Sequence, residues 1–155
     1  MFAALIVQAV AVLAAAAAVP QIDDACYLLE SARSRAIIGA DMVPSETPIQ
    51  SVPGLPVCTR LNKANDRYVE LEVRMPPAVN ARASFETGKR QLASDRAFVV
   101  IPGVGDGAYR TAMTIGTETL TYVFVLKGDK FISLTLTGFN NADLVALAKA
   151  IADQL

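Results

Sequence analysis

Residues 67–75, which read RYVELEVRM, decide the fold. Apolar residues occupy the odd-numbered positions from 69 to 75, and charged residues stand between them: Glu70, Glu72 and Arg74. Successive side chains of a β-strand point to opposite faces of the sheet. The alternation therefore predicts a strand with one buried face and one wet face, as is typical of an antiparallel sheet.

Further strands and helices are expected on both sides of this strand. We expect strands at residues 57–61, 97–101, 108–115, 120–126 and 131–137, with a hairpin turn at 127–130. We expect one helix over residues 26–37 that stops at Gly39, one over 78–93, and one that Asn141 caps near the C-terminus. Because strands occur in runs with helices at their margins, the order predicts an α+β domain. Its antiparallel sheet would have about five to six strands, with the helices packed on one face.

The N-terminal segment is expected to direct export. Residues 1–20 are apolar except for Gln8 and Pro20, and no charged residue occurs before Asp23. An apolar run followed by small residues is typical of a signal peptide, so we predict a signal helix over residues 1–18 that is cleaved after Ala18. An uncleaved membrane anchor is the alternative. Residues 19–155 would then form a single domain with a proline-rich loop at 42–56.

The two cysteines fit an exported protein. Cys26 and Cys58 lie 32 positions apart and form no CxxC motif. A pair of cysteines in a small exported domain most simply forms one structural disulfide, whereas a redox-active pair would need a closer spacing. The expected location is periplasmic or secreted, or membrane-anchored if the leader is retained.

Composition excludes several classes of function. The formal net charge is −1, with 14 basic and 15 acidic residues, so an electrostatic nucleic-acid binder is disfavoured. The chain has no histidine, which excludes imidazole catalysis and histidine-based metal sites and leaves the serines without that activating base. No sequence motif indicates a cofactor, and none is expected.

The most distinctive segment for a site lies at residues 102–109 and reads PGVGDGAY. Its candidate residues are Gly103, Gly105, Asp106, Gly107 and Tyr109. Closely spaced glycines can expose backbone amides to a ligand, but the spacing fits neither a dinucleotide fingerprint nor a P-loop. We therefore expect a strand-connecting turn in which Asp106 bonds local amides, with a ligand-contacting loop as the alternative.

Charged residues elsewhere suggest solvated surfaces. Glu70 and Glu72 share one strand face and could in principle act as paired carboxylates, but Arg74 continues that face, so a solvated face is expected. Lys89, Arg90 and Arg96 form a modest basic cluster that is expected on an exposed helix surface.

Several short segments together resemble a class of exported bacterial domains of unknown function. They are DACYLL at residues 24–29, Cys58, GVGD at 103–106 with Ala108 and Tyr109, and LKGD at 126–129. The class is best represented by small actinobacterial envelope lipoproteins with paired cysteines. The resemblance implies an exported, disulfide-linked α+β domain and carries no catalytic residues. The chain lacks the lipobox cysteine of the lipoprotein members.

These observations predict a non-catalytic binding or interaction domain of the bacterial cell envelope. Its partner would be an envelope protein or a small ligand, and contact with a membrane would come only through the N-terminal segment. Two alternatives stay open. One is a small enzyme that uses carboxylates and Tyr109, and the other is an inhibitor of a secreted enzyme that inserts the proline-rich loop.

Overall fold

The computed structural model describes residues 25–45, 56–64, 66–74, 80–95 and 98–155, with side chains of the third helix described as far as residue 92. The predicted signal helix and the centre of the proline-rich loop lie outside these residues. The elements, in chain order, are α1 (Cys26–Glu30), α2 (Ala32–Ile38), β1 (Val43–Pro44), β2 (Val57–Leu61), β3 (Tyr68–Arg74), α3 (Ala81–Asp95), β4 (Phe98–Val100), β5 (Gly107–Ile115), β6 (Glu118–Lys127), β7 (Lys130–Thr137) and α4 (Asn141–Ala152).

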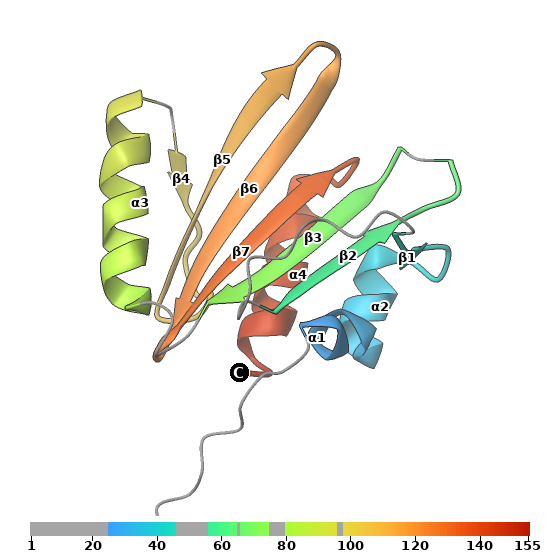
Figure 1. The fold of residues 1–155 in the computed structure, drawn as a ribbon, viewed down its shortest axis with the longest axis horizontal. Helices are drawn as coiled ribbons and strands as arrows, with labels where there is room; N and C mark the ends of the chain where they lie inside the picture. Colours follow the sequence, from blue (N-terminus) through green and yellow to red (C-terminus); the bar gives the residue numbers. More distant parts are fainter. Residues whose placement is uncertain (1–24, 46–55, 65, 75–79, 96–97) are drawn as a thin grey trace, which may run out of the picture.

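The strands form one antiparallel sheet in the order β1-β2-β3-β7-β6-β5-β4. The alternating stretch forms β3, in the interior of the sheet, with β2 on one side and β7 on the other (Figure 1). Val69, Leu71 and Val73 are fully buried, while the residues between them are half-buried. The α+β class and the antiparallel sheet are therefore confirmed.

The sheet has seven strands, so the expected five to six is wrong by one strand. The additional strand is β1, which lies in the segment we expected to be a proline-rich loop, and pairs Val43 with Leu61 and Pro44 with Arg60. Because β1 is an edge strand, Pro44 needs to supply no N–H to a partner on its outer side. A very short edge strand that carries proline also discourages pairing with other chains.

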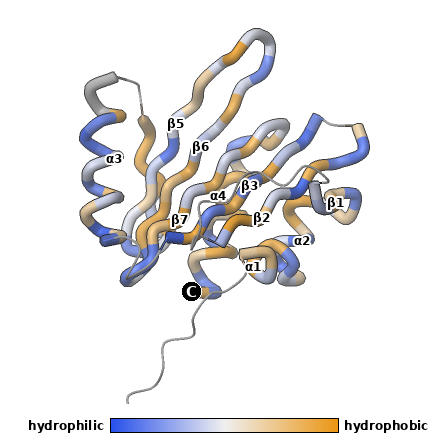
Figure 2. Tube along the Cα trace, viewed as in Figure 1, coloured by the Kyte–Doolittle hydropathy of each residue, from blue (hydrophilic) through white to orange (hydrophobic). Residues whose placement is uncertain are grey.

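Helices cover both faces of the sheet, so the expectation that they pack on one face is wrong. The face that carries Val125 and Ile132 holds the main core with α1, α2 and α4. Their neighbours in sequence, Leu126 and Phe131, point to the opposite face and pack against α3. Figure 1 shows α3 beside the β4–β5 side of the sheet, apart from the other three helices. In Figure 2, α3 is mostly hydrophilic, as expected of a helix that buries only a narrow stripe.

The N-terminal helix differs from the single helix expected over residues 26–37. It is divided at Ser31, whose backbone is extended and whose hydroxyl accepts a hydrogen bond from the Ser34 amide. A serine at this position offers the backbone a cap in place of a helical bond, which starts α2 as a new helix. The last helix, α4, is capped by Asn140 rather than by the expected Asn141, through a 2.9 Å bond from the Asp143 amide to the Asn140 side chain.

The predicted disulfide between Cys26 and Cys58 is confirmed. It joins the start of α1 to β2, and Cys58 is buried in the main core. The buried Arg60 adds a second link between the same elements, because its guanidinium donates to Glu30 at 2.8 and 3.0 Å. None of the described helices is long and apolar enough to cross a membrane.

Candidate functional site

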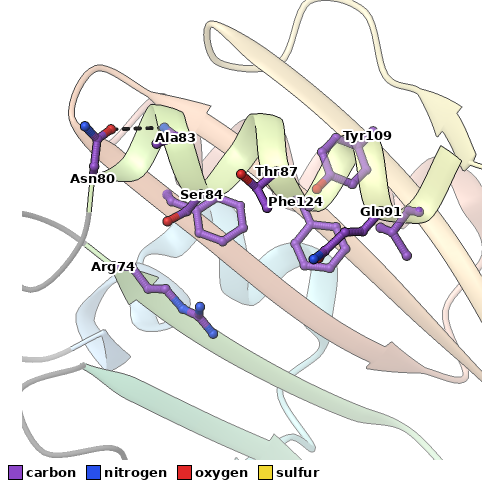
Figure 3. Close-up of a pocket in the computed structure, with 11 residues that line it drawn as sticks. Arg74, Asn80, Ala83, Ser84, Thr87, Gln91, Tyr109 and Phe124 are labelled. Carbon is purple, nitrogen blue, oxygen red and sulfur yellow. Dashed lines mark hydrogen bonds between the residues drawn. The ribbon is translucent and has the colours of Figure 1, made fainter. Parts of the chain in front are cut away.

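A cleft of about 570 Å³ lies between α3 and the face of the sheet that α3 covers. Arg74 enters it from β3, opposite the polar side chains of α3 (Figure 3). The described residues that line it are Arg74, Asn80, Ala83, Ser84, Thr87, Gly88, Gln91, Leu92, Tyr109, Phe124 and Phe131. A volume of this size is in the range of small-molecule sites.

The helical wall is a stripe of uncharged polar residues. Asn80 precedes α3 and caps it, because its side-chain oxygen accepts a 3.0 Å bond from the Ala83 amide. Ser84, Thr87 and Gln91 follow at helical spacing, so they lie on one side of α3, along the cleft. The wall therefore presents hydroxyl and amide groups but no charge.

The floor of the cleft is aromatic. Tyr109 lies 5.0 Å from Phe124 between ring centroids, and Phe124 stacks on Phe131 at 5.9 Å with an interplanar angle of 10°. Phe85 of α3 packs on Tyr109 at 5.0 Å and holds the helix on this floor. Aromatic pairs at these distances add stability beyond their buried area, so the floor is a fixed apolar surface.

Tyr109 carries the most unusual group in the cleft. Its side chain is 1% exposed, and its hydroxyl has no hydrogen-bond partner among the described residues. Burial, with a smaller contribution from the charge of Glu86, raises the pKa of Tyr109 to about 12. The hydroxyl therefore stays protonated at any physiological pH and is available as a donor.

The close approach of α3 to this tyrosine depends on a glycine. A Cβ atom at Gly88 would lie 2.7 Å from the Tyr109 hydroxyl oxygen, which is closer than real contacts allow. Glycine in a helix interior costs about 1 kcal/mol relative to alanine. Position 88 nevertheless needs glycine, because a larger residue would collide with the Tyr109 hydroxyl. The residue that destabilises α3 is therefore also the one that lets α3 pack against Tyr109.

The positive charge that Arg74 brings to the cleft is compensated by the carboxylate of Glu72. Its guanidinium makes two bonds to Glu72, at 2.6 and 3.2 Å, and lies 5.7 Å from the centroid of the Phe131 ring. A bidentate pair of this kind fixes the arginine in one orientation. The cleft therefore carries little net charge at this end.

The structure separates the sequence-predicted loop residues. Gly103 and Gly105 have positive φ angles of 72° and 56°. Asp106 bonds the neighbouring β6–β7 hairpin, so the expectation that its carboxylate bonds local amides of the turn is wrong. Its amide donates to the Leu126 carbonyl at 2.8 Å, and its carboxylate accepts from the Gly128 amide at 2.7 Å. Of the five candidates only Tyr109 lines the cleft.

The remaining two candidates, Gly107 and Tyr109, lie on β5 near α3. A Cβ atom at Gly107 would meet the Phe85 ring at 3.3 Å, so this glycine lets the helix approach the strand. A role of residues 103–107 in ligand contact stays a prediction.

The carboxylates considered for catalysis have partners of their own. Glu70 accepts a 2.6 Å bond from the Tyr68 hydroxyl, and Glu72 holds Arg74. Burial, followed by the bond to Glu70, raises the pKa of Tyr68. In the sheet register, Glu72 is three strands away from Tyr109, about 14 Å between backbones. Paired action of these groups with Tyr109 therefore has no geometric support.

Other charged groups add no metal site. The described residues contain no group of three or more acidic or cysteine side chains that could hold a metal ion. Of the expected basic cluster, Arg90 is exposed and donates to the Thr87 hydroxyl at 3.2 Å, Lys89 is half-buried, and Arg96 lies outside the described residues.

No family model matches the chain, and no curated protein is found to be similar to it. The resemblance to envelope lipoprotein domains therefore stays a prediction.

Proposed function

We propose that this protein is a non-catalytic binding domain of the bacterial cell envelope that takes a small, uncharged, partly apolar ligand in the cleft under α3. The observation that carries the proposal is the cleft itself, in which an aromatic floor and a polar helical wall flank the hydroxyl of Tyr109, a group without a hydrogen-bond partner among the described residues. Sites of this kind, largely apolar with a few placed polar groups, are typical of small-molecule binding.

The charges around the cleft favour an uncharged ligand. Arg74 is compensated by Glu72, and the polar side chains that line the described part of the helical wall carry uncharged hydroxyl and amide groups. A ligand with a strong charge would lose its hydration without gaining a free counter-ion among the described lining residues. An apolar body that rests on Phe124 and Phe131 loses no comparable hydration.

Export is the proposed setting. The Cys26–Cys58 disulfide is compatible with an oxidising compartment, where such bonds persist. Support for the leader comes from the apolar sequence of residues 1–20 and its small residues near position 18. The proposal therefore concerns the domain that begins after this leader, in the periplasm or outside the cell.

Binding of Nile red, an uncharged dye whose fluorescence rises in apolar surroundings, tests the proposal. Ser84→Phe places a ring in the cleft, while Arg82→Phe places the same ring on an exposed position of α3 that does not line it. We expect saturable binding to the wild type and to Arg82→Phe, and at least tenfold weaker binding to Ser84→Phe. Circular dichroism checks that both variants fold. Equal binding by the two variants, or no saturable binding by the wild type, would refute the proposed site.

A further inference from the structure

We infer that Tyr109 is the polar anchor of the cleft and that the ligand offers it the oxygen of an uncharged carbonyl, as a ketone or an amide attached to an apolar body. This inference rests on the proposed function, because it names the chemistry of the ligand that the cleft would take. It also assigns a specificity-determining role to a residue of β5.

The Tyr109 hydroxyl is a donor that the described residues leave unpaired. Its oxygen is buried and has no hydrogen-bond partner in the described part of the chain. Buried polar groups in folded proteins nearly always have a partner, and leaving one unpaired is unfavourable. A ligand in the cleft that Tyr109 lines can supply the missing acceptor.

Helix α3 lies close over this buried hydroxyl, at a position where only glycine fits. Position 88 of α3 is glycine, and any side chain there would collide with the tyrosine oxygen. A phenylalanine at position 109 would fill the aromatic floor without presenting a polar atom to α3. The chain instead combines a tyrosine whose hydroxyl has no partner in the described part of the structure with a glycine that accommodates this hydroxyl.

The charges near the Tyr109 hydroxyl favour an acceptor that is itself uncharged. The negative charge of Glu86 disfavours ionisation of the Tyr109 hydroxyl. For the same reason, it disfavours a negatively charged ligand group next to this hydroxyl. Arg74 carries the compensating carboxylate of Glu72 and adds no net positive charge. A carbonyl oxygen accepts a hydrogen bond without bringing a charge, so it fits this environment better than a carboxylate.

Benzophenone and diphenylmethane form a matched pair of probes, because they carry the same two rings and differ by a carbonyl group. Titration of each into the ¹⁵N-labelled mature protein, followed by amide chemical shifts, gives both the affinity and the site. We expect the wild type to bind benzophenone about fivefold more tightly than diphenylmethane, the ratio that one net hydrogen bond produces. In Tyr109→Phe the ratio should fall to about one, with the affinity for diphenylmethane unchanged.

The possible outcomes separate this inference from the proposed function. Equal affinities of the wild type for the two probes, or a preference for the ketone that persists in Tyr109→Phe, would overturn the role of Tyr109 while leaving a binding cleft. If neither probe binds, or if both shift amides far from α3 and β6, the proposed function fails and the inference fails with it.

Discussion

Replacement of Gly105 by alanine tests the packing of the glycine-rich turn, and Gly103→Ala is its matched control. Both glycines have positive φ angles, so alanine is strained at either position by about 1–2 kcal/mol. Alanine also lowers the conformational entropy of the unfolded chain, which stabilises the folded state by about 0.4–1 kcal/mol. The net loss from backbone strain alone therefore lies between about 0 and 1.6 kcal/mol, with a midpoint near 1 kcal/mol.

The two positions differ in what a new methyl group would meet. At Gly103 no atom of the described residues lies within 4 Å of the new methyl group, whereas at Gly105 it would collide with the Leu126 carbonyl oxygen and would lie 2.8 Å from a methyl of Val125. The same carbonyl accepts the Asp106 amide, so moving it also strains that bond. Overpacking against backbone adds about 1–3 kcal/mol. We expect Gly105→Ala to lose about 3 kcal/mol of unfolding free energy and Gly103→Ala about 1 kcal/mol.

Urea unfolding of both variants, followed by far-ultraviolet circular dichroism with the disulfide intact, measures this difference. The slope of free energy against urea should stay unchanged, so that the shift in midpoint reports stability alone. Equal stability of the two alanine variants would refute the steric argument. If both variants are as stable as the wild type, alanine is not strained by the positive φ angles at these positions either.

Four further perturbations have defined outcomes. Replacing Cys26 and Cys58 together by alanine should lower the unfolding free energy by about 3–4 kcal/mol in urea, because the bridge closes a long loop. Asp106→Ala should lose about 1 kcal/mol in the same assay and Asp106→Asn less, since asparagine keeps an acceptor for the Gly128 amide. Burial raises the pKa of Tyr109 from 10.0 to about 12, so its contribution to stability is complete below pH 10 and is lost as the pH rises to 12. Between pH 10 and pH 12 the unfolding free energy of Tyr109→Phe should therefore fall by about 2–3 kcal/mol less than that of the wild type. Gly88→Ala should destabilise the wild type but stabilise Tyr109→Phe by up to about 1 kcal/mol, as a thermal double-mutant cycle would show.

The sequence predicts the strands well where one face is buried and the other is wet. The alternation around Leu71 has a period of two that only a strand satisfies, so β3 and the class of the sheet follow from it. The break at Ser31 was not predicted, because the apolar spacing continues through it and only the local capping bond reveals it. The edge strand at Val43 and Pro44 depends on pairing with β2, which a segment rich in proline does not indicate.

The cleft was largely missed for a different reason. Tyr109 was singled out with the glycines near it, but its partners Ser84, Phe124 and Phe131 come from three other elements. These residues come together because α3 packs on the face of the sheet opposite to the other helices. Composition and periodicity do not predict which face of the sheet a helix covers. One signal was present, since Gly88 interrupts an otherwise helical pattern, and a glycine there can indicate close approach by another element.

Photo-crosslinking with benzophenone tests the central claim, that the cleft under α3 is a binding site, most directly. Irradiation of the bound ketone attaches it to the nearest carbon–hydrogen bonds, and mass spectrometry of the digested protein locates the attachment. The account predicts labelling on residues 83–92 of α3 or on Phe124 and its neighbours in β6, competed away by excess unlabelled diphenylmethane. Labelling spread over the surface, or concentrated on elements outside the cleft and not competed, would contradict it.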